Sequence, residues 1–265
     1  MTGDHNAELY NEVMEITRQV SGLSTVTLPR ETKSAIYYSD YDRWALEDRP
    51  THASYVIYSL LGEHINSWFR FVSRSNFNLD GIKLLYIPRM RFTEPVLTEK
   101  IVRFVENGGT AVIFDPDFFK FNIDGSAVAE RGKLLNFKLT AKPGAGAYLL
   151  YKNKRMPLTE IKHIEGPEAN KIYAFDIEKI PANAKVLATY SDKKPAIIEY
   201  ACGKGRVIFS AVMPFGSSDA AIAPGAWKDF AADLAEKVGE KTGLDVWFFE
   251  LPEVTPKTFD LKPLK

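Results

Sequence analysis

The stretch from Asn78 to Phe119 constrains the fold of this chain more than any other part. It contains an apolar run, Leu84 to Pro88, an amphipathic segment, and a second apolar run, Thr110 to Phe114, that stops at Asp115-Pro116. Short apolar runs on either side of a helical repeat predict one β-α-β unit. Open α/β sheets usually bind ligands beyond the carboxyl ends of their strands, so the two loops after these runs are the first candidates for a site.

The helix inside this unit has recognisable ends. We expect Thr93 to cap it, and Pro95 falls in its first turn, where the missing N–H costs nothing. Gly108 supplies the left-handed position that often ends a helix. The buried stripe is expected to consist of Leu97, Ile101, Phe104 and Val105.

Further strands and helices alternate around this unit. Residues 34–39 and 68–72 read as strands, and residues 51–65 read as a helix capped by Thr51. A polar and aromatic loop is predicted for residues 40–50. The pattern predicts an α/β fold of the flavodoxin-like kind, with a mainly parallel sheet and helices on both faces.

The second half of the chain has a different pattern. Residues 122–205 read as a β-rich excursion, and Gly203-Lys204-Gly205 predicts a β-hairpin whose second strand could re-enter the main sheet. A last amphipathic helix runs from Trp227 to Val238. The predicted division is a leader helix and connector in residues 1–33, an α/β domain in residues 34–250 and a tail in residues 251–265.

Composition excludes some partners. The chain has 265 residues, and its 34 basic residues balance its 34 acidic residues, so no net field attracts nucleic acid or an anionic membrane. The first residues lack a signal-peptide pattern and no apolar run approaches the ~20 residues that span a bilayer, so we expect a soluble chain. The cytoplasm, and the periplasm or cell exterior after removal of a signal peptide, stay open as compartments.

The sequence predicts neither a metal site nor a cofactor. Cys202 is the only cysteine, and it lies in a predicted strand without a paired His, which favours a structural role. The four histidines are scattered without metal-ligand spacing. Gly203-Lys204-Gly205 lacks the spacing and the following helix of a phosphate-binding loop.

Four charged residues follow the two strands of the β-α-β unit. Asp115 and Asp117 could hold a divalent cation or act as an acid and base pair, but no His or third acid completes a metal set, which favours a turn-capping role. Arg89 and Arg91 could clamp a carboxylate or sugar hydroxyls. They could equally be solvated, or pair with Asp115 and Asp117.

Another candidate ligand loop follows the first strand. Asp40, Tyr41, Asp42 and Trp44 combine carboxylates with an aromatic surface, a mixture that suits the apolar face and hydroxyl rim of a sugar. Such a loop could also pack against a neighbouring subunit. We therefore add Asp40 and Trp44 to the candidate ligand-binding residues.

With these residues read, a family resemblance can be stated. LDGIKLLYIPRMRFTEPVLTEKIVRFVENGGTAVIFDP resembles the class I glutamine amidotransferase-like fold of the β-galactosidase trimerisation domain, the middle module of family-42 glycoside hydrolases. AIYYSDYDRWAL resembles its first strand and Trp-bearing loop, and PANAKVLATYSDKKPAIIEYACGKGRVIFSA resembles its Gly-Lys-Gly hairpin segment. ELYNEVMEITRQV is similar to the helix that connects the catalytic barrel to this module. The resemblance covers about residues 6 to 250.

The resemblance implies a non-catalytic domain that helps to assemble subunits, and so a homo-oligomer. The chain has no room for a (β/α)₈ barrel of about 250 residues beside this domain, so the family's catalytic glutamates have no counterpart here. Asp115-Pro116 also stands where an amidotransferase would need its Cys. The first hypothesis is therefore an assembly domain of, or related to, a β-galactosidase, with a glycosidase barrel in the parent chain and carbohydrate contact as a further role.

Two alternatives remain at this point. One is a small hydrolase or sugar-processing enzyme with its site at the carboxyl edge of the sheet. The other is a ligand-binding sensor domain. The residues of the enzyme site would be Asp40, Arg89, Arg91, Asp115 and Asp117.

Overall fold

The structure is a computed structural model, which describes residue 15 and residues 32–46, 49–142, 146–158, 174–212 and 225–243. Residues 32–244 group into one compact unit. The predicted leader helix, except for Glu15, and the predicted tail lie outside the described residues.

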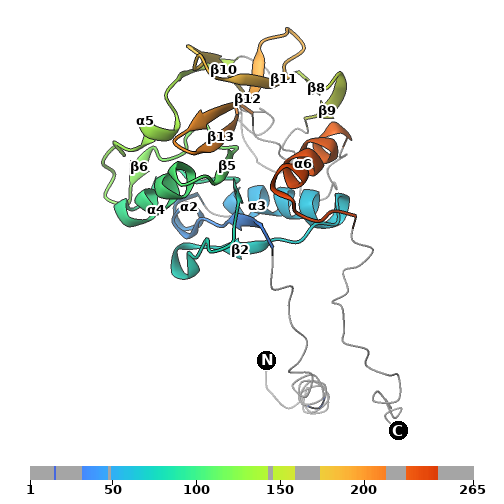
Figure 1. Cartoon of the computed structure of the whole chain (residues 1–265). Coiled ribbons are helices and arrows are strands. Elements are labelled where there is room, and N and C mark those ends of the chain that lie inside the picture. The colour runs from blue at the N-terminus through green and yellow to red at the C-terminus, as the bar shows by residue number, and fades with distance from the viewer. Residues whose placement is uncertain are drawn as a thin grey trace, which may run out of the picture. The chain divides into compact units, whose positions relative to one another are not determined.

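A nine-stranded sheet organises this unit (Figure 1). Two shorter pairs accompany it: β4 (Phe92–Thr93) with β6 (Phe121–Asn122), and β7 (Lys138–Lys142) with β10 (Ala174–Glu178). The nine strands are, in spatial order, β2 (Arg70–Val72), β1 (Ser34–Tyr37), β3 (Leu84–Ile87), β5 (Thr110–Ile113), β13 (Gly205–Ser210), β12 (Pro195–Cys202), β11 (Lys185–Thr189), β8 (Tyr148–Tyr151) and β9 (Lys154–Pro157).

The sheet is mixed, which corrects the prediction of a mainly parallel one. The strands from β2 to β13 are parallel, whereas β12, β11, β8 and β9 continue the sheet antiparallel. Four described strands of the predicted β-rich excursion, β8, β9, β11 and β12, thus extend the main sheet. The β12–β13 hairpin makes the change of direction, and β13 pairs in parallel with β5, as predicted for its return to the main sheet.

Helices cover both faces of the sheet, as the sequence predicted. Alternate strand residues point to opposite sides: Ile36 belongs to the core shared with α3 and α6, and its neighbour Ala35 belongs to the core shared with α4. Trp227 and Phe230 of α6 fill the first core, and Ile101 of α4 is buried in the second. The helical segments are α2 (Asp40–Leu46), α3 (Arg49–Ser59), the π-helical turn η2 (Leu60–His64), the 3₁₀ turn η3 (Arg74–Asn76), α4 (Pro95–Glu106), α5 (Arg131–Leu134) and α6 (Gly225–Val238).

Residues 40–46 form helix α2, so the prediction of a loop there is wrong. The Ser39 hydroxyl accepts a hydrogen bond from the Asp42 N–H at 3.2 Å, and the Ser39 carbonyl accepts one from the Arg43 N–H at 3.1 Å. Ser39 therefore acts as an N-cap, and acidic residues in the first turn suit the positive end of the helix dipole. The Ser39 cap therefore favours a short helix, although the composition of residues 40–46 is typical of a loop.

The predicted helix starts also need correction. Glu94, with extended backbone, is the N-cap of α4 and makes no side-chain capping bond. Thr93 instead lies in β4, where its hydroxyl is 3.0 Å from that of Thr98. Helix α3 begins at Arg49, so Thr51 lies inside its first turn.

The hairpin glycines pack against the end of α4. A Cβ atom on Gly205 would lie 2.2 Å from the carbonyl oxygens of both Val105 and Gly109. The backbone N–H of Lys204 donates to the Glu106 carbonyl at 2.9 Å. This close approach explains the glycine at position 205 by packing.

Candidate functional site

The carboxyl ends of β3 and β5 bring the four predicted loop residues to one edge of the sheet. This carboxyl edge consists of the loop 88–91 after β3 and the loop 114–117 after β5, which are neighbours because β3 and β5 pair in parallel. Each loop contributes one buried residue, Arg89 or Asp115, and one more exposed residue, Arg91 or Asp117.

Asp115 joins the two loops. One carboxylate oxygen accepts a hydrogen bond from the Met90 N–H at 3.0 Å, and the other accepts one from the Asp117 N–H at 2.9 Å. The side chain is almost fully buried, and burial raises the pKa of Asp115 although the charge of Arg89 acts to lower it. Both of its oxygens are therefore used within the protein.

Arg91 and Asp117 form an ion pair at the more exposed side of this edge. The Lys120 ammonium contacts the second Asp117 oxygen at 3.0 Å. Partial burial acts to raise the pKa of Asp117, but the Lys120 hydrogen bond and the Arg91 charge together hold it below its ordinary value. Of the readings left open for Arg91, the structure contains the ion pair across the edge.

Arg89 is buried beside Asp115. Its Nε atom has no hydrogen-bond partner among the described residues. The guanidinium supplies a positive charge next to the Asp115 carboxylate, and this charge offsets part of the cost of burying that carboxylate.

Asp42 also belongs to this edge, although from the sequence we named it only as part of the loop after the first strand and did not select it as a ligand-binding residue. It is fully buried, its carboxylate accepts hydrogen bonds from the Ser39 hydroxyl at 2.5 Å and from the Arg91 N–H at 3.0 Å, and it lies near enough to Asp115 for their charges to interact. Burial, and to a lesser degree Asp115, raise the pKa of Asp42 to about 6. The three-residue spacing from Ser39 was the only sequence signal for this inward orientation.

Asp40 and Trp44 lie apart from this hydrogen-bonded set. Neither makes a hydrogen bond or ion pair with Arg89, Arg91, Asp115 or Asp117 in the part of the chain that the structure describes. Asp40 begins α2, and the Trp44 side chain is 70% exposed, with its ring edge-on to Tyr41 at 5.7 Å. The predicted site residues thus form two separate groups.

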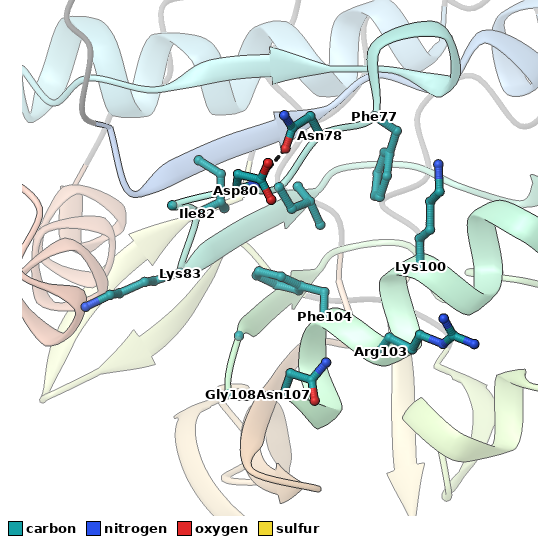
Figure 2. Close-up of a pocket in the computed structure, with 13 residues that line it drawn as sticks. Phe77, Asn78, Asp80, Ile82, Lys83, Lys100, Arg103, Phe104, Asn107 and Gly108 are labelled. Carbon is teal, nitrogen blue, oxygen red and sulfur yellow. Dashed lines mark hydrogen bonds between the residues drawn. The ribbon is translucent and has the colours of Figure 1, made fainter.

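The opposite edge of the same unit contains a cavity of about 820 Å³ (Figure 2). This amino-edge groove lies between the second half of α4 and the loop 77–83 that leads into β3. Phe77 and Phe104 line it together with Lys83, Lys100 and Arg103. The sequence pattern did not indicate it, because its residues come from a loop and from successive turns of a helix.

An exposed aromatic patch lies at the β2 border of the sheet. We define it as Tyr55, Tyr58, Phe69 and Phe71. Tyr55 and Phe71 are 54% and 44% exposed, and each ring stacks on Tyr58, at 5.9 and 6.3 Å. Among the described strands β2 pairs only with β1, so this patch borders an unpaired strand edge.

Within the described ranges, no three His, Cys, Asp or Glu side chains are grouped as a metal site would require. No helix among these residues is both long enough and apolar enough to cross a membrane.

Two curated β-galactosidases are similar to this chain. β-Galactosidase BglY of Alicyclobacillus acidocaldarius is 23% identical over an alignment 283 positions long, which spans 95% of this chain and 37% of the relative. β-Galactosidase YesZ of Bacillus licheniformis is 23% identical over an alignment 255 positions long, which spans 89% of this chain and 36% of the relative. No family model matches the chain.

Solved structures of the same kind of enzyme share the fold. A catalytic mutant of Gan42B, a GH42 β-galactosidase from G. stearothermophilus, superposes with a TM-score of 0.63 at 18% identity, covering 90% of this chain and 35% of that one. The β-galactosidase of Bacillus circulans sp. alkalophilus gives a TM-score of 0.59 at 20% identity, over 90% and 36%. The predicted resemblance is confirmed: about nine-tenths of this chain is similar to a region that makes up about a third of β-galactosidase BglY in sequence and of Gan42B in fold.

Proposed function

We propose that this chain is a non-catalytic assembly domain of, or related to, a family-42 β-galactosidase, with the amidotransferase-like variant of the flavodoxin-like fold. The observation that carries the proposal is the extent of the similarity, which takes in almost the whole chain but only 35% of Gan42B. In this proposal the glycosidase barrel belongs to the parent chain or to a partner.

The hydrogen bonding of Asp115 supports a non-catalytic role. Asp115 occupies the position at the end of β5 where an amidotransferase would need a nucleophile, and both of its oxygens accept backbone hydrogen bonds. A carboxylate that accepts these two backbone hydrogen bonds stabilises the loops after β3 and β5.

The aromatic patch supports assembly. Aromatic side chains are enriched at protein interfaces, and an unpaired strand edge offers backbone groups to a partner. We propose that Tyr55 and Phe71 pack against a second copy of this chain.

The test is the oligomeric state by size-exclusion chromatography with light scattering. We expect the wild-type chain to form a defined oligomer and the double variant Tyr55→Ser with Phe71→Ser to dissociate at least about tenfold more readily. Val96→Ser is the matched control, because Val96 is also an exposed apolar residue but lies on α4. A wild-type chain that stays monomeric at all concentrations would contradict the assembly role.

Carbohydrate contact is the finer part of this proposal, and it rests on Trp44. An indole that is 70% exposed and packs T-shaped against Tyr41 offers a flat apolar surface to a sugar ring. Saturable binding of galactose or lactose that disappears in Trp44→Ala would support it. Unchanged binding in that variant would exclude Trp44 as the contact.

A second candidate function is a hydrolase at the carboxyl edge. The observation that favours it is the pair of buried carboxylates, Asp42 and Asp115, whose pKa values are both raised. Turnover of any member of a panel of aryl glycosides and aryl esters, lost in Asp115→Asn, would establish this function. It would also overturn the non-catalytic proposal.

A further inference from the structure

The amino-edge groove has an apolar floor that the core does not cover completely. Phe77, Leu79 and Phe104 are only partly buried, although each packs against the core beneath α4. Figure 2 shows the Phe104 ring near the middle of the groove and Phe77 toward one end. With a volume of about 820 Å³, the groove falls in the range of small-molecule sites.

One wall of this groove is fixed before any ligand arrives. The Arg70 guanidinium donates to the carbonyl oxygens of Asn78 and Asp80, at 3.0 and 2.7 Å. The Asn78 side chain in turn accepts a hydrogen bond from the Asp80 N–H at 2.7 Å, which Figure 2 marks. Because this wall is already ordered, less conformational entropy is lost when a ligand binds.

The rim of the groove is cationic. Lys83 and Lys100 lie on opposite sides of Phe104 in Figure 2, and neither ammonium group has an ion-pair partner among the described residues. Arg103 also lines the groove, but its charge is offset by Glu99 at 2.5 Å. Asp80 is the only acidic residue among those that line it.

These features select a type of ligand. A neutral apolar molecule would leave both lysines unused, and inorganic phosphate would leave the aromatic floor unused. The Lys100 ammonium lies 6.0 Å from the centre of the Phe77 ring. A carboxylate that pairs with this ammonium would therefore bring the apolar part of the same ligand close to an aromatic ring. Both lysines are exposed and flexible enough to turn inward toward such a group.

We propose that the amino-edge groove binds a small planar organic anion, with its flat apolar body on Phe77 and Phe104 and its carboxylate at Lys83 or Lys100. This site lies at the opposite edge of the sheet from Asp115 and is independent of the assembly role. It requires neither a barrel nor a second copy of the chain.

The test is a titration of the full chain followed by two-dimensional amide NMR. The probes are 2-naphthoate, its neutral analogue 2-naphthalenemethanol, and inorganic phosphate alone. We expect saturable shifts of the amides near Phe77, Lys83 and Gly108 with 2-naphthoate, and at least about tenfold weaker binding of either other probe. Equal affinity for the neutral analogue, shifts elsewhere on the protein, or no saturable binding at millimolar 2-naphthoate would each overturn the proposal.

Variants locate the charge that matters. Lys83→Ala combined with Lys100→Ala should weaken 2-naphthoate binding about tenfold and leave the neutral analogue unaffected. Lys185→Ala, an exposed lysine on β11, is the control and should change neither. A hexaglutamate peptide that binds this groove more tightly than 2-naphthoate would assign it to an acidic protein segment and overturn the small-anion proposal.

Discussion

The carboxyl edge and the amino edge of the β3–α4–β5 unit differ in how they use their charges. At the carboxyl edge Asp115 is buried with both oxygens hydrogen-bonded, and Arg91 is paired with Asp117. At the amino edge Lys83 and Lys100 are exposed, and no described acidic group pairs with either. Charge at the end of a strand is therefore a poor guide to binding unless its partners are known.

The difference has a topological cause. The loops after β3 and β5 lie side by side in a parallel sheet, so oppositely charged residues in them can satisfy one another. The groove instead lies between the loop 77–83 and helix α4, which are separated in sequence by β3 and β4. Its lysines lie on opposite sides of an apolar floor, where no acid of the unit reaches them.

The largest effect is expected from Gly205→Ala, a change in the backbone packing of the amino edge. The new methyl group would overlap two carbonyl oxygens, so we expect the free energy of unfolding to fall by about 3 kcal/mol in urea denaturation. Gly132→Ala is the control, because a Cβ there meets nothing within 4 Å. A loss below about 1 kcal/mol would mean that the hairpin can move away from α4.

Removal of the Asp115 carboxylate at the carboxyl edge should have the next largest effect on stability. Asp115→Ala leaves the Met90 and Asp117 N–H groups without acceptors and Arg89 without its counter-charge, so we expect a loss of about 2 kcal/mol. Asp117→Ala breaks a half-exposed ion pair and should cost less than about 1 kcal/mol. Equal losses of unfolding free energy in the two variants would contradict the distinction between the buried, hydrogen-bonded Asp115 and the more exposed Arg91–Asp117 ion pair.

The pH dependence of stability tests the environment of Asp42. Because the pKa of Asp42 is about 6 in the folded chain and near 3.8 ordinarily, the folded state retains a proton that the unfolded state has lost between these values. Stability should therefore fall as the pH rises from about 4 to 6. We expect Asp42→Asn to reduce this fall by on the order of 1 kcal/mol. Asp80→Asn, at an exposed position, should leave the profile as in the wild-type chain, and an unchanged profile in both would show that Asp42 does not titrate in this window.

The smallest effect is expected from the lysines of the amino-edge groove. Lys83→Ala combined with Lys100→Ala should change the free energy of unfolding by less than about 0.5 kcal/mol, because neither side chain has an ion-pair partner among the described residues. Thermal unfolding monitored by circular dichroism would measure this. A clear destabilisation would show that these lysines stabilise the folded chain. The two edges would then not differ in how they use their charges.

Local rules predicted the central unit well. Short apolar runs placed β3 and β5 within a residue or two, and Pro95 marked the first turn of α4. The same rules were wrong for residues 40–46, because capping by Ser39 outweighed the polar and aromatic composition of that segment. They were also wrong for Thr93, whose hydroxyl pairs with Thr98 rather than capping the helix.

The sequence predicted that the four loop residues lie at one edge of the sheet, but it did not predict their hydrogen bonds. Arg89, Arg91, Asp115 and Asp117 do meet at one edge, since parallel strands end together. Whether a carboxylate there faces solvent or accepts two backbone hydrogen bonds depends on the conformation of the opposite loop. No spacing within the sequence contains that information.

The sequence by itself determined the β-α-β unit, the hairpin at Gly203 to Gly205 and the likeness to a region of β-galactosidases, because each depends on the local order of residues. Only the tertiary structure decided that the sheet becomes antiparallel beyond β13 and that Asp42 faces inward. The same is true of the groove between Phe77 and Phe104 at the amino edge. These features depend on contacts between segments far apart in sequence, and burial sets the energy of such contacts.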